Sequence, residues 1–142
     1  MIQSRTPRQT EPQLSADGRR LRLDHITQRI IRCVHVVSNS LGPGFLEKVY
    51  ENALGVELEL VGLRAMQQQR IEVTYRNVVI GDFVADLLVD DCVLLEIKAV
   101  KALDEIFTAQ CMNYLKATGL QVCLLINFGT PKATVKRIVL GF

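Results

Sequence analysis

The sequence contains no tryptophan, and aromatic residues make up only 6% of its 142 residues, so few rings are available to stack on nucleic-acid bases. It also lacks a long hydrophobic run, because every apolar stretch is far shorter than the roughly 20 residues that span a bilayer. The first 20 residues contain no apolar segment that could serve as a signal peptide. These absences predict a cytoplasmic protein with no membrane contact.

Cysteine pairs with the spacing of zinc ligands are absent as well. The four cysteines are 59, 19 and 12 residues apart, and no CxxC or Cys–His ligand pattern joins them: Cys33, Cys92, Cys111 and Cys123. Each lies in an apolar stretch, where a free thiol behaves as a small hydrophobic side chain. We therefore expect free cysteines, a reducing compartment and no zinc site.

Neither sign of charge dominates the chain, which has 17 Lys and Arg against 15 Asp and Glu. Residues 1–22 contain five arginines and two acidic residues, a balance of +3. The remaining 120 residues contain 12 basic and 13 acidic side chains, a balance of −1. The folded part therefore lacks a broad basic surface, and contact with a polyanion would need a local patch, the N-terminal segment or a bound cation.

Hydrophobic residues make up 49% of the chain, which is enough for one domain with a real core. Composition predicts a disordered tail over residues 1–20 and a single domain over 21–142. Helical periodicity favours three helices, at about 23–40, 45–61 and 104–118. Alternating or continuously apolar segments favour strands at 71–75, 78–80, 83–89, 92–100, 121–128 and 133–140. The predicted fold class is α/β (α+β), a mixed β-sheet flanked by helices in the order ααβββαββ.

Ionisable residues interrupt the apolar strand faces of the segment GDFVADLLVDDCVLLEIKAV. Side-chain alternation places Asp86 in phase with Leu88, and Glu96 and Lys98 in phase with Leu94. Two carboxylates ~5 Å apart repel each other by about 3 kcal/mol at an effective dielectric of ~20, and one lysine does not easily neutralise both. A magnesium ion held by the two carboxylates and a structural salt bridge from Lys98 are equally consistent with this spacing.

The length of the hairpin loop separates these two interpretations. A two-residue turn at positions 90–91 would place Asp86 and Glu96 on opposite faces of the sheet. A loop with an odd number of residues, or a β-bulge, would place them on the same face. We predict this second arrangement, and a two-residue hairpin would count against a metal site.

Two of the predicted helices contain further candidate site residues. Glu47 shares a helical stripe with Tyr50 and follows a Gly-Pro-Gly turn that could approach a backbone or a phosphate. Its simpler interpretation is a glutamate favoured by the helix dipole. Gln110 and Tyr114 lie one turn apart and could hydrogen-bond nucleobases or phosphate oxygens, or could border the core.

The string LGPGFLEKVYENAL has Gly44, Glu47 and Tyr50 in the arrangement that names the GxxExxY proteins. The chain resembles this family from about residue 23 to its C-terminus, including the strings DFVADLLVDDCVLLEIKAV, AQCMNYLKATGL and LLINFG. The family is a compact branch of the PD-(D/E)xK nuclease superfamily. The resemblance therefore implies a PD-(D/E)xK nuclease-like core.

The resemblance also implies roles for the matching positions. Asp86 and Glu96 would bind Mg²⁺ or Mn²⁺ together with the main-chain carbonyl of Ile97, and Glu47 would complete the metal site. Lys98 would orient the attacking water or stabilise charge on the scissile phosphate. The implied catalytic residues are thus Asp86, Glu96 and Lys98.

The nucleic-acid-binding residues implied by the resemblance are Tyr50, Gln110 and Tyr114, of which the last two match a Q-x-x-x-Y element of the exonuclease-like branch. Two positions depart from the family pattern. Relatives often carry histidines where this chain has Ser38 and Phe107. Any help that those histidines give to chemistry or metal binding is absent here.

The predicted function is that of a metal-dependent nuclease that hydrolyses phosphodiester bonds in DNA, or in RNA, with a homodimer left open. The alternative is a non-catalytic interaction or nucleic-acid-binding module that keeps the nuclease-like fold, which the small size and few aromatic residues also allow. A third interpretation is a structural subunit whose polar face is covered by a partner.

Overall fold

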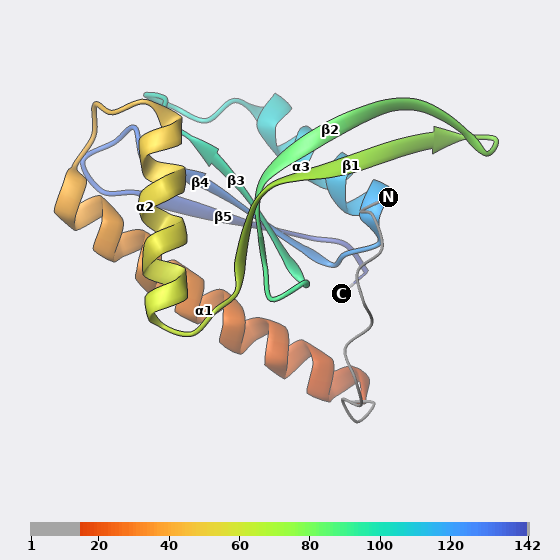
Figure 1. Ribbon diagram of the computed structural model, residues 1–142, viewed down its shortest axis with the longest axis horizontal. Coiled ribbons are helices and arrows are strands. Elements are labelled where there is room, and N and C mark those ends of the chain that lie inside the picture. Colours follow the sequence, from red (N-terminus) through yellow and green to blue (C-terminus); the bar gives the residue numbers. More distant parts are fainter. Residues whose placement is uncertain (1–14, 142) are drawn as a thin grey trace.

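The computed structural model describes residues 15–141 of the chain. Within them, three helices and five strands follow one another in the predicted order (Figure 1): α1 (Ala16–Leu41), α2 (Glu47–Leu60), β1 (Ala65–Tyr75), β2 (Val78–Val89), β3 (Val93–Lys98), α3 (Glu105–Thr118), β4 (Val122–Asn127) and β5 (Thr134–Val139). The predicted α+β class is confirmed. None of the helices in this part of the chain is long and apolar enough to cross a membrane.

Helix α1 begins earlier than its apolar periodicity predicts. It starts at Ala16 rather than near residue 23, because Ser15 caps it and its side chain accepts a hydrogen bond from the amide of Gly18 at 3.0 Å. Asp17 adds a favourable negative charge in the first turn. The tail expected over residues 1–20 is therefore helical from Ala16 onward, and residues 1–14 lie outside the described part.

The five strands form one mixed sheet in the order β1-β2-β3-β4-β5. All neighbouring strands are antiparallel except β3 and β4, which run parallel and are connected through α3. The turn predicted between β1 and β2 is present at Arg76 and Asn77, whose φ angles of 49° and 65° are typical of tight hairpins. The central position predicted for the apolar segment that becomes β4 is also confirmed.

Helices cover both faces of the sheet and create two separate cores (Figure 1). Leu95 and Ile97 of β3 belong to the core under α1 and α2. Leu94 of the same strand belongs to the core under α3. Because side chains alternate along a strand, Glu96 and Lys98 lie on the face toward α3.

Strands β1 and β2 extend beyond the rest of the sheet as a two-stranded arm (Figure 1). β2 is one strand of 12 residues rather than the two shorter strands predicted, because Gly81 and Asp82 continue its pairing with β1. Its first seven residues are exposed, and β2 becomes buried only from Ala85 onward. The buried half of β2 therefore begins just before Asp86.

Candidate active site

A three-residue loop joins β2 to β3. The last pair of their ladder is Val89 with Val93, so the loop has the odd length that a shared face requires. Arg64 supports the loop through an ion pair with Asp91 and through a hydrogen bond from its amide to Oδ1 of Asp90 at 2.9 Å. With this register, the two predicted carboxylates point to the same face of the sheet.

Asp86 lies where β2 diverges from β3. The ladder between these strands ends at the pair Leu87 and Leu95, so the adjacent Asp86 has no ladder partner in β3. In place of a strand partner, the amide of Ile97 donates a hydrogen bond to Oδ2 of Asp86 at 2.7 Å. The carboxylate thereby satisfies an amide in β3 that the departing strand leaves without a partner, as buried N–H groups require.

Glu96 is buried, with only 6% of its surface exposed. Its carboxyl group lies beside the side chains of Asp86 and Tyr114, and both of them influence its pKa. Burial, together with the hydrogen bond and the negative charge of Asp86, raises the pKa of Glu96 to about 9. Without a cation, the carboxyl group of Glu96 therefore keeps its proton at neutral pH.

Helix α3 covers this pair and the neighbouring lysine. Burial and the charge of Glu96 raise the pKa of Tyr114, so its phenol stays protonated. The Nζ atom of Lys98 lies 4.4 Å from the centroid of the Phe107 ring, a cation–π contact. Gln110 lies between these two aromatic residues on α3 and is half-buried. The face toward α3 thus brings together an acidic pair, a lysine and two aromatic rings.

A hollow of about 620 Å³ opens beside Asp86, between the start of α2 and the segment after β3. Glu47, Lys48 and Glu51 of α2 line it together with Asp86. Glu47 itself is exposed, and among residues 15–141 no three Asp, Glu, His or Cys side chains converge closely enough to hold a metal ion. The structure thus places Asp86 beside Glu96, and it places Glu47 in the lining of the hollow that also reaches Asp86.

Close packing against the end of β4 holds the segment after β3. Oδ1 of Asn127 accepts a hydrogen bond from the amide of Val100 at 3.0 Å, and its Nδ2 donates to the carbonyl of Val100 at 2.9 Å. Gly129 passes so closely that a Cβ there would lie 2.2 Å from the carbonyl oxygen of Val100, so only glycine fits. These contacts position Ala99 and Val100, which line the hollow.

Tyr50, predicted to contact nucleic acid, lies instead in the core. Its ring is fully buried and stacks on Phe128 with a centroid distance of 4.6 Å. Its hydroxyl donates to the carbonyl of Gly42 at 2.6 Å and accepts a hydrogen bond from the amide of Phe45 at 3.1 Å. A ring without exposed surface cannot contact nucleic acid, so that prediction is wrong. Tyr50 instead holds the loop between α1 and α2 in place, and Glu47 is the first residue of α2 after this loop.

The two positions at which relatives often carry histidines are occupied by side chains that make other contacts in this protein. Ser38, where relatives often carry a histidine, is buried, and its hydroxyl accepts a hydrogen bond from the amide of Ala133 at 2.9 Å. Phe107, at the second such position, contacts Lys98 through its ring. The metal-binding role of the Ile97 carbonyl and the nucleic-acid-binding role of Gln110 stay predictions.

Glu51 is a polar residue of this region that sequence reasoning missed. It is only 3% exposed, and its carboxylate accepts hydrogen bonds from Lys48, Gln67 and Gln68. Its signal in the sequence is its position one helical turn after Glu47, on the same stripe of α2. Because β1 is distant in sequence, its glutamine partners could not be inferred from that spacing.

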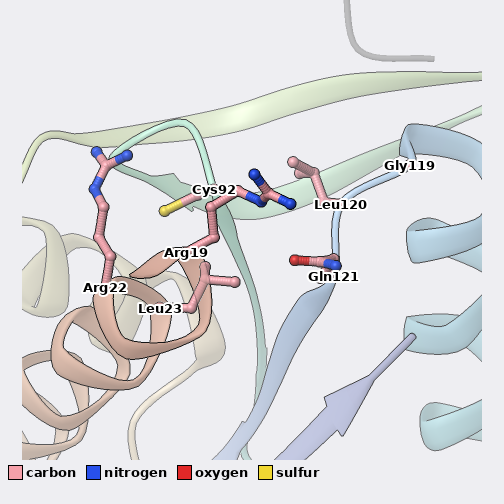
Figure 2. A pocket seen from close by; sticks show the side chains of 7 residues that line it. All are labelled: Arg19, Arg22, Leu23, Cys92, Gly119, Leu120 and Gln121. Atoms are coloured by element: carbon pink, nitrogen blue, oxygen red, sulfur yellow. The ribbon is translucent and has the colours of Figure 1, made fainter. Parts of the chain in front are cut away.

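Figure 2 shows a second cavity, of about 290 Å³, that is separate from the predicted site. Arg19 and Arg22 from the start of α1 line it together with Cys92 and Gln121. Cys92 and Gln121 precede β3 and β4, whereas Lys98 ends β3, so the two sites lie at opposite ends of these parallel strands. None of the predicted site residues lines this second cavity.

The chain is similar to known proteins both in sequence and in fold. A family model described as the PD-(D/E)XK nuclease superfamily matches residues 24–138. The crystal structure of an alkaline exonuclease (LHK-Exo) from Laribacter hongkongensis is similar in fold, with a TM-score of 0.52 and 14% identity over 92% of this chain and 73% of that one. No curated protein matched the chain. Because the family model covers most of its length, the chain belongs to the PD-(D/E)XK nuclease superfamily.

Proposed function

We propose that the protein is a cytoplasmic, metal-dependent nuclease of the GxxExxY branch, which hydrolyses phosphodiester bonds in DNA. The observation that carries this proposal is that Asp86 and Glu96 lie on one face of the sheet, near enough for Asp86 to raise the pKa of Glu96, with Lys98 on the same face of β3. Two carboxylates and a neighbouring cation are suited to bind a divalent metal ion and a phosphate together. All the proposed residues come from one chain, so a homodimer is compatible with the proposal but not required by it.

The donor groups fit Mg²⁺ or Mn²⁺. Carboxylate and carbonyl oxygens are the hard ligands that these ions prefer, and the raised pKa of Glu96 reflects a site that needs added positive charge. Asp86, Glu96 and the carbonyl of Ile97 would hold the ion, with Glu47 contributing from α2. When bound, the ion would lower the pKa of a water molecule and offset negative charge on the phosphate.

The protein's own groups would do the remaining work. Lys98 lies two residues from Glu96 on the same strand face, a spacing of ~7 Å, from which its ammonium group would stabilise charge on the scissile phosphate. Tyr114 would orient Glu96 through its hydroxyl group. Gln110, one turn earlier on α3, would contact the nucleic acid.

One observation favours a second candidate function. Within the described residues, Glu47 does not join the acidic pair to form a three-residue metal cluster. A module that kept the nuclease-like fold for binding or protein interaction would not need that third carboxylate. Metal uptake distinguishes the two candidates, because the nuclease requires a divalent ion and the binding module does not.

The test combines calorimetry with Mg²⁺ and Mn²⁺ and cleavage assays on single-stranded, duplex and branched DNA, with RNA as a second substrate and a chelator as the metal-free reference. Asp86→Ala and Lys98→Ala should each reduce metal-dependent cleavage by at least about 10²- to 10³-fold while the fold stays intact. Circular dichroism and the thermal midpoint would verify the fold.

Asp82→Asn is the matched control for these variants. Asp82 lies on the same strand as Asp86, but it is exposed and pairs with Arg70 at 2.7 Å. This variant should cleave at the wild-type rate. Wild-type activity in Asp86→Ala and Lys98→Ala, or no metal uptake by the native protein, would refute the nuclease proposal.

A further inference from the structure

Gln68 has an unusual backbone conformation in the middle of β1. Its φ angle is 56°, in the left-handed region that residues with a Cβ adopt rarely. The ladder pairs the residues on either side of Gln68 with Leu87 and Ala85, and it skips Gln68 and Asp86 themselves. The irregularity in β1 therefore lies directly opposite the proposed catalytic aspartate.

The facing strand is irregular at the same point. Ala85 and Leu88 both belong to the core under α3, whereas Leu87 belongs to the core under α1 and α2. In a regular strand, residues two apart share a face and residues three apart do not. The alternation of β2 is therefore broken next to Asp86, although the register with β1 is the same on both sides of this point. A local irregularity of this kind redirects a side chain.

Helix α2 holds the side chain of Gln68. Its Nε2 atom donates to Oε1 of Glu51 at 2.8 Å. Oε2 of Glu51 accepts hydrogen bonds from Nε2 of Gln67 at 2.6 Å and from Nζ of Lys48 at 2.8 Å. A buried carboxylate thus binds two consecutive glutamines of β1. Hydrogen bonds to a charged group are stronger than neutral ones, so they can offset the cost of one left-handed residue.

We propose that Glu51 and Gln68 are positioning residues for Asp86. Glu51 holds Gln68 in its left-handed conformation, and the resulting irregularity lets the Asp86 carboxylate reach the Ile97 amide beside Glu96. The inference rests on the proposed nuclease function, which requires the Asp86 carboxylate in that place. Neither Glu51 nor Gln68 is assigned contact with the metal ion or the substrate.

Glu59 provides a matched control on the same helix. Its Oε1 atom accepts a hydrogen bond from the amide of Ala65 at 2.9 Å, so it also connects α2 to β1. Unlike Glu51, it is exposed and binds the first residue of β1, away from Gln68. Glu51→Ala and Glu59→Ala each remove one carboxylate between the same two elements, but only the first should affect Asp86.

The first readout is the hydrogen-exchange rate of the Ile97 amide, measured by NMR on metal-free protein with chelator. Glu51→Ala should speed this exchange about tenfold relative to the other amides of β3, because the Asp86 acceptor loses its position. Glu59→Ala should leave it unchanged. Equal Ile97 protection in Glu51→Ala and wild type would overturn the inference.

Substitutions at position 68 separate backbone conformation from side-chain chemistry. Gln68→Gly should keep Ile97 protected, because glycine adopts positive φ without support, whereas the β-branched Gln68→Val should lose the protection. The double variant Glu51→Ala/Gln68→Gly should recover the protection that Glu51→Ala loses. A general loss of stability would not be rescued by glycine, so failure of this rescue would contradict the positioning role.

The second readout is Mn²⁺ affinity measured by calorimetry, which should fall about tenfold in Glu51→Ala and Gln68→Val but not in Gln68→Gly or Glu59→Ala. The two readouts fail in different ways. If the native protein binds no Mn²⁺ but Ile97 protection still depends on Glu51, the proposed function fails and the positioning role stands. If Mn²⁺ binds normally and neither readout depends on Glu51, the positioning role fails and the nuclease proposal stands.

Discussion

The two faces of β3 bury very different groups. Leu95 and Ile97 point toward α1 and α2 and are surrounded by hydrocarbon side chains. Glu96 lies between them in sequence but points toward α3, where its carboxyl group lies beside Asp86 and Tyr114. A strand of six residues thus has one face that stabilises the fold and one face that carries ionisable groups.

This difference has opposite consequences for the free energy of folding. Complete burial of a leucine side chain contributes about 1.5–3 kcal/mol. Burial of a carboxyl group is unfavourable unless partners compensate, and the raised pKa of Glu96 is a consequence of that cost. Groups with strongly shifted pKa values are typical of functional sites, which agrees with the proposal that Glu96 serves chemistry rather than stability.

The largest effect should come from the apolar face. Leu95→Ala removes a fully buried side chain between Leu87 and Leu124 and should lower the free energy of unfolding by about 2–5 kcal/mol. Urea denaturation would measure the change. Mn²⁺ affinity under native conditions should stay at the wild-type value, and a loss of affinity without a loss of stability would break the division between the two faces.

Replacement of Glu96, the residue next to Leu95, should raise the free energy of unfolding rather than lower it. The pKa of Glu96 in the folded protein, about 9, lies above its ordinary value of 4.5, so between these two pH values the folded state binds more protons than the unfolded state. The stability of the metal-free protein should therefore decrease as the pH rises through this interval. Glu96→Gln should remove this part of the decrease and be more stable than wild type near pH 8.

Urea midpoints in chelator, measured from about pH 5 to pH 9, would test this prediction. Asp82→Asn, which removes an exposed carboxylate from β2, should retain the wild-type slope. The contrast between the faces would be lost if Glu96→Gln followed the same pH dependence as wild type, because burial of Glu96 would then carry no cost.

A smaller effect is expected where the apolar core meets the loop before α2. Tyr50→Phe keeps the ring stacked on Phe128 but removes the hydroxyl that binds Gly42 and Phe45, and should cost about 1 kcal/mol. Thermal denaturation would measure it, with the exposed Tyr75→Phe as a control near zero. A wild-type midpoint for Tyr50→Phe would show that the loop does not depend on that hydroxyl.

Much of the candidate site could be predicted from the sequence, because strand alternation depends only on local geometry. Asp86 and Glu96 stood out as charged residues in otherwise apolar phases, and the condition that they share a face required an odd loop. The three-residue loop between Val89 and Val93 meets that condition. Two consecutive aspartates alone did not distinguish a two-residue turn from a longer one.

Other features depended on contacts between distant segments. Tyr50 is an amphipathic side chain that could stack on a nucleobase or in a core, and only the position of Phe128, which follows β4, decided between them. Glu51 is an ordinary helix residue in sequence, and its burial depends on Gln67 and Gln68 of β1. The left-handed conformation of Gln68 carried no sequence signal, because glutamine favours no such conformation.

The sequence by itself determined the order of helices and strands, the apolar faces and the acidic and lysine residues that alternate with them, because periodicity and side-chain chemistry are local properties. Only the tertiary structure decided that Asp86 lies beside Glu96, that Tyr50 lies in the core and that Glu51 of α2 binds Gln68 of β1. These outcomes depend on register, on the divergence of β2 from β3 and on packing between segments far apart in the chain. Such contacts form only when the whole chain folds.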